Sequence, residues 1–398
     1  MAKITPLFET PDTTEEMKSY KEKLFRHKAG IGVRSLICIV AVAGLVFGMW
    51  SWSRFKTYGG YEVLSSNERT DTLNTQYAEY NGKILKYSRD GISCVNLRNE
   101  ALWSQTYNMQ MPILDVCQNS VVVADMQGNE AYVFDEEGLR TQITTLLPIQ
   151  RVSVSSQGVT AMLLSDSSAS WICLYDDEGE KLTEARCRLS ETGQPLAVGI
   201  SSDGRKVAVS YLQIQGGSSA SCIVFYNFGS VGGNFVDKIV ASKVYEDQLI
   251  PRIEYMGDSI CAAVSDRGII YYEGKEIPEE KAVVEEAAEI RSVFTGTEHV
   301  GIVVEGAEKE GARYEVHLYD TSGNLVLNQG TNLAYSQVKM SGGDLILFNE
   351  SECEIYSRQG ILRYTGNFSG TIADIYKGSG LRKYILVFSD RTEEIKLK

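Results

Sequence analysis

Histidine, the side chain most often used for acid–base catalysis and zinc binding, is scarce in this chain. Among 398 residues only His27, His299 and His317 are histidines. His27 lies in an N-terminal segment, and the other two fall in neighbouring predicted strands of one unit. The chain therefore has few histidines from which a Ser/His/Asp triad or a histidine metal site could be built. We interpret these imidazoles as surface or strand side chains. We predict no catalytic, cofactor-binding or metal-binding residue.

Two other patterns that could serve binding or catalysis are equally unspecific. The glycine-rich stretches that begin at Gly216 and Ser230 lack the strand-to-helix context of a phosphate-binding loop. Paired carboxylates are frequent, for example after Pro278, but two-carboxylate hydrolysis depends on a pair that is close in space. The segment that begins at Pro278 is predicted to be a short helix, or a fourth strand plus a connection, with its charges on a solvated face.

The eight cysteines do not form a recognisable disulfide framework. Cys38 lies in a long apolar run. The other seven lie mostly within apolar strands and lack CxxC spacing: Cys94, Cys117, Cys173, Cys187, Cys222, Cys261 and Cys353. A secreted disulfide framework usually has an even count in a short chain. We interpret these residues as buried small hydrophobes, which leaves room for one chance pair but not for a framework.

Residues 35–53 form an uncharged apolar run of the length needed to cross a bilayer. Arg34 and Arg54 bracket the run, and Trp50 and Trp52 lie at its far end, where indole favours the membrane interface. We predict a transmembrane helix. The alternative is a cleaved secretory signal, but its small-residue string would lie mid-run with more apolar residues after it.

The charges around this run predict its orientation. Residues 1–34 carry seven Lys/Arg and five Asp/Glu, whereas the whole chain has a net charge of −13, so residues 54–398 carry −15. The basic side of a span stays in the cytoplasm, which makes 1–34 a cytoplasmic basic tail and 54–398 an extracytoplasmic domain at the cell membrane. An acidic domain repels phosphates, so we expect no nucleic-acid partner. Gly44 and Gly48 form a GxxxG pattern that favours a weak homodimer through the span.

A short pattern recurs along residues 54–398 and indicates repeated β-structure. An aliphatic residue, an aromatic residue and usually a polar one are followed by a glycine, at Gly138, Gly179, Gly229, Gly274, Gly323 and Gly360. The spacing is that of a four-stranded propeller blade. We predict that the pattern marks the turn from the third to the fourth strand, that its aromatic packs between blades, and that its Asp or Asn bonds the backbone. Calcium binding by these turns would need oxygen ligands at several alternate positions, whereas only one acidic position is shared by most copies, so we favour the backbone role.

Counting units predicts an all-β propeller of eight blades, with seven as the alternative. Residues 75–107 form the first unit, and six more follow. The last segment holds only three strands, whereas the stretch after Gly60 reads as a lone strand. A propeller leaves no open edge when a strand from one terminus completes the last blade, so we expect the strand near Tyr61 to Ser66 to do this.

The turn of the first unit, with Asn99 and Glu100, and Trp103 in its fourth strand resemble the repeat of quinoprotein-like propellers. The chain from about residue 35 looks like a family of bacterial single-pass membrane proteins with an exported quinoprotein-like or WD40-like propeller. Quinoprotein dehydrogenases carry a tryptophan docking motif in most blades. Here Trp171 is the only other tryptophan outside the apolar run. The resemblance therefore implies the architecture and no quinone cofactor.

Two classes of function fit this reading. The first is a binding or scaffold module of the cell envelope, which holds a protein or wall ligand. The second is an envelope enzyme, a lyase or hydrolase with a site in the propeller channel. Three extended loops are predicted on one face of the disc, and binding residues tend to lie on such loops. The candidate partner-binding residues are Ser165, Asp166, Gln213, Gln215, Gly216, Ser218, Glu308, Lys309 and Glu310.

Overall fold

The computed structural model describes residues 25, 27, 36–48, 55–69, 74–166, 169–187, 193–215, 217–306 and 311–398. The chain divides into two compact units, Met1–Thr57 and Tyr58–Lys398.

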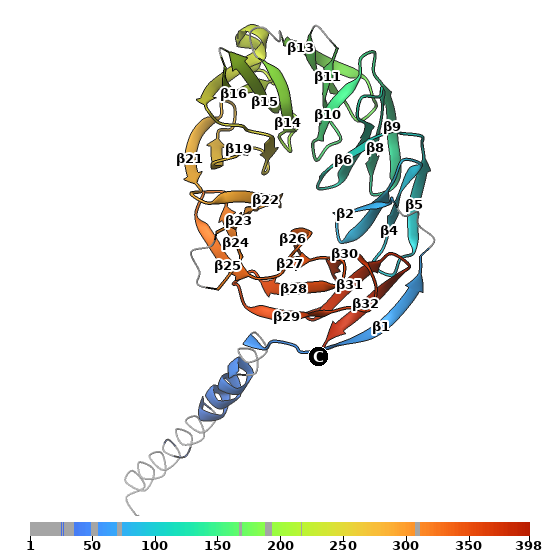
Figure 1. Cartoon of the computed structure of the whole chain (residues 1–398), viewed down its shortest axis with the longest axis vertical. Helices are drawn as coiled ribbons and strands as arrows, with labels where there is room; N and C mark the ends of the chain where they lie inside the picture. The colour runs from blue at the N-terminus through green and yellow to red at the C-terminus, as the bar shows by residue number, and fades with distance from the viewer. Residues whose placement is uncertain are drawn as a thin grey trace, which may run out of the picture. The chain divides into compact units, whose positions relative to one another are not determined.

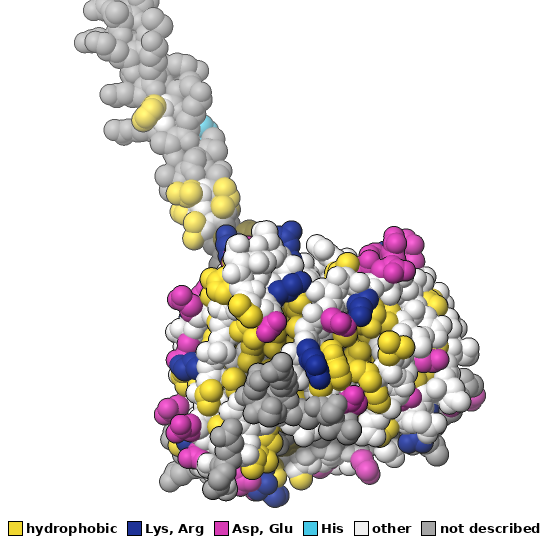
Figure 2. All heavy atoms as spheres, turned by 90° about the horizontal axis from the view of Figure 1, so that it is seen from above, with side chains coloured by type: hydrophobic (Ala, Val, Ile, Leu, Met, Phe, Trp, Pro, Cys, Tyr) yellow, Lys and Arg dark blue, Asp and Glu magenta, His cyan; other side chains and the backbone are white. Residues whose placement is uncertain are grey.

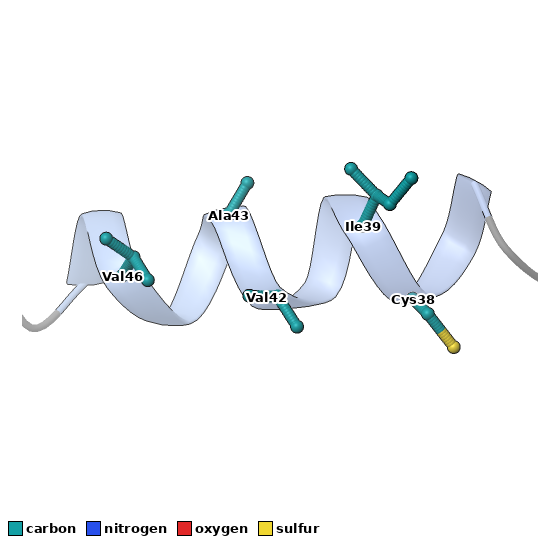
Figure 3. Close-up of a pocket in the computed structure, with 5 residues that line it drawn as sticks. All are labelled: Cys38, Ile39, Val42, Ala43 and Val46. Carbon is teal, nitrogen blue, oxygen red and sulfur yellow. The ribbon is translucent and has the colours of Figure 1, made fainter.

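In the first unit, residues 36–48 form a helix with every side chain exposed. Figure 3 shows five of these side chains, including Cys38 and Val46, projecting from a single helix. Gly44 and Gly48 lie in this helix, whereas Arg34, Trp50, Trp52 and Arg54 lie outside the described residues. Within the described part of the chain, we find no helix with the length and apolar character needed to cross a membrane.

The second unit is a closed ring of eight antiparallel four-stranded sheets (Figure 1), which confirms the eight-bladed propeller. Blade 1 contains β2 (Gln76–Tyr80), β3 (Lys83–Tyr87), β4 (Gly91–Val95) and β5 (Ala101–Thr106). Blade 2 contains β6 (Pro112–Cys117), β7 (Ser120–Asp125), β8 (Glu130–Asp135) and β9 (Gly138–Thr144). Blade 3 contains β10 (Ile149–Val154), β11 (Thr160–Ser165), β12 (Ser170–Tyr175) and β13 (Lys181–Cys187). Blade 4 contains β14 (Gln194–Ile200), β15 (Lys206–Gln215), β16 (Ser218–Asn227) and β17 (Ile239–Glu246).

The other four blades follow the same order. Blade 5 contains β18 (Arg252–Tyr255), β19 (Ile260–Ser265), β20 (Gly268–Glu273) and β21 (Glu279–Glu285). Blade 6 contains β22 (Glu289–Thr295), β23 (His299–Glu305), β24 (Tyr314–Asp320) and β25 (Leu325–Thr331). Blade 7 contains β26 (Gln337–Ser341), β27 (Asp344–Phe348), β28 (Glu352–Ser357) and β29 (Leu362–Asn367). Blade 8 contains β30 (Ile372–Lys377), β31 (Lys383–Phe388), β32 (Arg391–Leu397) and β1 (Tyr61–Glu68).

The hydrophobic pattern explains how the blades pack. Second strands such as β7 are apolar along nearly their whole length and are buried on both faces, because each sheet is covered by its two neighbours. Fourth strands such as β13 alternate exposed and buried residues, as expected at the rim. The segment after Pro278 forms the fourth strand β21, which settles the choice between helix and strand.

The recurring pattern marks the turn from the third to the fourth strand, as predicted. Gly138 and Gly179 adopt φ angles of 125° and 89°, which glycine tolerates and other residues rarely adopt. The Asp135 carboxylate accepts hydrogen bonds from the backbone N–H groups of Glu137 at 2.7 Å and Gly138 at 3.2 Å. In blade 4 the turn is longer and contains two short 3₁₀ helices, η1 (Gly232–Asn234) and η2 (Val236–Lys238).

The aromatic residue of the pattern packs between neighbouring blades, as predicted for Phe134. This side chain is fully buried against blade 1 and stacks on Trp103 with ring centroids 5.0 Å apart. Blade 4 differs by one residue. Phe225 faces blade 5, whereas Tyr226 faces blade 3 and takes the position that Phe134 has in blade 2.

The N-terminal strand β1 closes the ring by completing blade 8, as predicted. It pairs antiparallel with β32 from Tyr61 opposite Leu397 to Glu68 opposite Arg391. The ring of Tyr61 also packs against Phe368 of blade 7, at a centroid distance of 4.9 Å. Strands from the two ends of the described propeller therefore form one sheet.

Candidate functional site

The propeller has two faces with different connections. Turns from first to second and from third to fourth strands lie on one face, which we call the turn face. Connections from second to third strands and from one blade to the next lie on the opposite face, which we call the loop face. The described candidate partner-binding residues lie at the loop-face ends of blades 3 and 4. Ser165 ends β11 and Asp166 follows it, whereas Gln213, Gln215 and Ser218 belong to β15 and β16.

In blade 3 the candidate residues lie at the end of the second strand. Ser165 ends β11, and its hydroxyl lies 3.0 Å from the hydroxyl of Ser170. The Asp166 carboxylate accepts a hydrogen bond from the backbone N–H of Ala169 at 2.9 Å. The described part of this connection is therefore held by its own hydrogen bonds.

In blade 4 the predicted extended loop is a β-hairpin. β15 and β16 continue to pair far beyond the blade core, with Gln213 opposite Ala220 and Gln215 opposite Ser218. The tight turn is made possible by glycine, since Gly217 adopts a φ of 92°. Ile214 is 73% exposed near the tip. Gly216 and, in blade 6, Glu308, Lys309 and Glu310 lie outside the described residues.

A cleft on the loop face was not predicted. It has a volume of about 610 Å³ and opens between blades 1 and 2. Gln76 and Arg89 line it from blade 1, and Met111, Ile113 and Met126 line it from the connection to blade 2 and from blade 2 itself. These residues come from separate connections and share no motif, so no sequence signal pointed to them.

Hydrogen bonds hold the connection beside this cleft. The Asp125 carboxylate accepts the backbone N–H groups of Gln110 at 3.0 Å and Met111 at 2.8 Å. The backbone N–H of Met109 donates to the carbonyl of Arg89 at 2.9 Å. The cleft thus has a fixed wall and a mixed lining, in which Met and Ile side chains lie beside uncharged polar residues and one exposed guanidinium from Arg89. This combination suits a ligand that carries a carboxylate next to an apolar group.

The turn face is fastened by hydrogen bonds that run from blade to blade. The Tyr80 hydroxyl of blade 1 donates to the carbonyl of Asn119 in blade 2 at 2.6 Å. Ser120 donates to the carbonyl of Ser156 at 3.2 Å, and Ser156 donates to the carbonyl of Ser202 at 2.7 Å. These bonds join the first turns of blades 1 to 4.

Two further contacts on the turn face join blades that are not neighbours. The Cys117 sulfur of blade 2 lies 3.6 Å from the Ser202 hydroxyl of blade 4. The Ser341 hydroxyl of blade 7 donates to the Glu79 carboxylate of blade 1 at 2.7 Å. The inner strands are therefore drawn together on this face, whereas the cleft opens on the other.

Charged residues of the inner strands are paired across blades. Lys339 of β26 forms an ion pair with Asp374 of β30, and burial lowers the pKa of this lysine. Burial raises the pKa of Asp115 in β6, although its carboxylate accepts the backbone N–H of Val154 in β10 at 2.8 Å. These contacts connect adjacent blades at the inner edge of the ring.

The two propeller histidines lie in adjacent strands of blade 6, as expected. His317 is held between Glu286 at 2.9 Å and Glu315 at 3.1 Å, and the hydrogen bond to Glu286 raises the pKa of His317. His299 is buried, which lowers its pKa, and Arg358 donates to its Nε2 at 2.9 Å. Among the residues that the structure describes, no group of three His, Cys, Asp or Glu side chains is placed to hold a metal ion.

The cysteines are free thiols, and six of the seven in the propeller are buried. This confirms the interpretation as small core residues for these six, whereas Cys117 is half-buried. Cys187, for example, lies 2.9 Å from the Tyr211 hydroxyl and 3.5 Å from the Tyr226 hydroxyl in the core between blades 3 and 4.

The rim over blades 3 and 4 is a second exposed surface. Figure 2 shows apolar side chains there, interspersed with Lys and Arg. Leu182 of β13 and Val244 of β17 are exposed by 56% and 51%. They alternate with polar neighbours, as is typical of solvent-facing outer strands. We therefore place the candidate site on the loop face.

Comparison with known proteins identifies the family. Residues 54–397 match the family described as "Family of unknown function (DUF5711)". The chain belongs to this family. No curated protein matches the sequence. The match covers the whole propeller, so the fold described above is that of a DUF5711 domain.

Solved structures that resemble the chain share its fold at low sequence identity. Sqt1 of Saccharomyces cerevisiae is 11% identical with a TM-score of 0.51, over 86% of this chain and 100% of that chain. Dipeptidyl peptidase 4 of Porphyromonas gingivalis is 13% identical with a TM-score of 0.52, over 80% of this chain and 56% of that chain. BamB of Moraxella catarrhalis is 11% identical with a TM-score of 0.48, over 85% of this chain and 100% of that chain. The similarities to Sqt1 and dipeptidyl peptidase 4 concern the propeller fold alone.

Proposed function

We propose that the protein is a membrane-anchored propeller of the cell envelope that binds a partner on its loop face. The apolar run 35–53 is the proposed anchor, residues 1–34 the cytoplasmic tail, and residues 54–398 the extracytoplasmic domain. Gly44 and Gly48 are exposed on the described helix and would allow a weak homodimer through the span.

The difference between the two faces is the observation that carries this proposal. The turn face is tied by hydrogen bonds between neighbouring blades and by contacts between Cys117 and Ser202 and between Ser341 and Glu79. The loop face bears the cleft beside Arg89 and the projecting hairpin with Ile214. A rigid ring that carries a preformed cleft and a projecting hairpin on one face is suited to binding.

Site-specific cross-linking tests the proposal. A photoreactive residue at Gln110, beside the cleft, should give discrete adducts in native membranes. The same residue at Lys275, an exposed position in a turn of the turn face, should give none above background. Introducing Arg89→Glu should remove the Gln110 adducts, because it reverses the charge in the cleft.

Shortening the hairpin provides the second arm of this experiment. Replacing residues 213–220 by a two-residue turn should leave the fold intact, since Leu212 stays opposite the buried Ser221 and the blade core lies in the rest of β15 and β16. Equal adducts at Gln110 and Lys275, unchanged by either variant, would refute the loop face as the binding surface. If the only molecules found to bind were small molecules that the protein converts in its channel, the enzyme alternative would be favoured instead.

A further inference from the structure

The chain enters the propeller on the turn face, at a point fixed by backbone contacts. β1 occupies the place of a fourth strand, and fourth strands begin on the turn face. The backbone N–H of Tyr58 donates to the carbonyl of Arg363 at 2.8 Å, and the N–H of Lys398 donates to the carbonyl of Gly60 at 2.8 Å. The Arg382 guanidinium lies 5.6 Å from the Tyr58 ring.

An exposed leucine projects next to this entry point. Leu381 lies in the turn between β30 and β31 and is 96% exposed. Its backbone is held from both sides. Lys377 donates to the Leu381 carbonyl at 3.4 Å, and the N–H of Leu397 donates to the Arg382 carbonyl at 2.9 Å. The turn thus presents an apolar side chain that is almost fully exposed among the described residues of the ring.

Basic residues lie beside this leucine in the sequence and in the sheet. Arg382 and Lys383 follow it directly, and Lys396 lies opposite Lys383 in the pairing of β31 with β32. The entry patch, as we name it, consists of Leu381 and four basic residues: Arg382, Lys383, Lys396 and Lys398. Two of the cations have carboxylate partners, since Lys383 pairs with Glu394 at 2.8 Å and Lys398 with Glu62 at 2.9 Å. The patch therefore has an excess of positive charge on a domain whose net charge is −15.

We propose that the entry patch docks on the anionic headgroups of the membrane that holds the anchor, with Leu381 inserted at the interface. This inference rests on the proposed membrane anchor. Residues 54–57 are the tether between the apolar run and Tyr58, and four residues span at most about 14 Å. Basic residues at this distance from an anionic surface are attracted to it, and an exposed apolar side chain among them adds an interfacial contact. Docking of this patch would leave the loop face free for a partner.

The full chain in lipid vesicles provides the test. Spin labels are placed at Ser379→Cys, beside an intact Leu381, and at Ser219→Cys, an exposed serine of the loop-face hairpin. Both are made in a Cys38→Ala background, and the unmodified background corrects for labelling of other thiols. Vesicles contain either phosphatidylcholine alone or phosphatidylcholine with phosphatidylglycerol, and flotation shows whether the chain is anchored.

We expect the label at position 379 to collide several-fold more often with an apolar relaxant in the anionic vesicles than in the neutral ones. The label at position 219 should stay aqueous in both. Adding Leu381→Ser and Arg382→Glu should make position 379 aqueous while the chain still floats.

The outcomes separate this inference from the proposed function. A chain that floats while position 379 stays aqueous would overturn the docking and leave the anchor intact. Equal lipid contact in both vesicle types would overturn the assignment of anionic lipid. A chain that does not float would overturn the anchor and, with it, the docking.

Discussion

Deleting residues 58–68 should abolish the closed ring and leave a chain that unfolds at a lower temperature or aggregates. The deletion removes β1, which exposes the backbone edge of β32 along its whole length from Arg391 to Leu397. An open strand edge is a template for pairing with other chains. The deletion also removes Tyr61 from Phe368 and Tyr58 from the core between blades 7 and 8. With each lost hydrogen bond costing roughly 1 kcal/mol net, we expect a loss of several kcal/mol.

Thermal unfolding and light scattering measure this effect. The control is a deletion of residues 1–53, which leaves every strand in place and should melt like the propeller of the full chain. A melting temperature and scattering equal to those of the control would show that blade 8 is stable as a three-stranded sheet, contrary to this account.

Phe134→Ala should be the most destabilising single substitution among those considered. Phe134 is fully buried, stacks on Trp103 and fills the space between blades 1 and 2 near the turn face. Removing a buried phenylalanine leaves a cavity, which typically costs about 3–5 kcal/mol. Chemical denaturation should therefore show a large decrease in the midpoint.

The matched control is Phe235→Ala. Phe235 lies between η1 and η2, is 39% exposed, and belongs to no buried cluster of the described propeller. Its substitution should change the free energy of unfolding by about 0.5 kcal/mol or less. Similar losses for the two variants would contradict the claim that the patterned aromatic fastens adjacent blades.

The blade count and the closure were predictable because both depend on local signals. The turn of each third strand needs a residue at positive φ or a sharp bend, so glycines such as Gly138 and Gly179 recur with the period of the fold. Continuous apolar second strands report burial by two neighbours. The surplus strand near Tyr61 and the three-stranded last segment implied each other, since an open edge is unfavourable.

The hairpin of blade 4 was not predictable in the same way. Its distal part contains Gln213, Gln215 and several serines, and these residues have the composition of a loop. Pairing there depends on backbone hydrogen bonds and on the turn at Gly217, and neither leaves a hydrophobic pattern. The shift from Phe225 to Tyr226 was hidden for a related reason, because two adjacent aromatics fit the pattern equally well.

The candidate cleft was beyond sequence reasoning because its walls come from two blades. Gln76 and Arg89 belong to blade 1, whereas Met111 and Met126 belong to the connection into blade 2 and to blade 2 itself, and only the packing of the two blades brings these pairs together. The frequent carboxylates of the sequence have structural roles in the propeller. Asp135, for example, accepts hydrogen bonds within a turn, and Asp374 forms an ion pair between two blades.

Labelling of intact cells with a membrane-impermeant thiol reagent tests the central claim most directly. The claim is that the propeller lies outside the cell membrane and the N-terminal tail inside. The measurement compares Ser219→Cys, at an exposed position of the hairpin, with Thr10→Cys in the tail, both against the unmodified chain. We predict that position 219 reacts in intact cells and that position 10 reacts only after the cells are lysed. Reaction at position 10 in intact cells, or protection of position 219 until lysis, would contradict an anchored extracytoplasmic propeller.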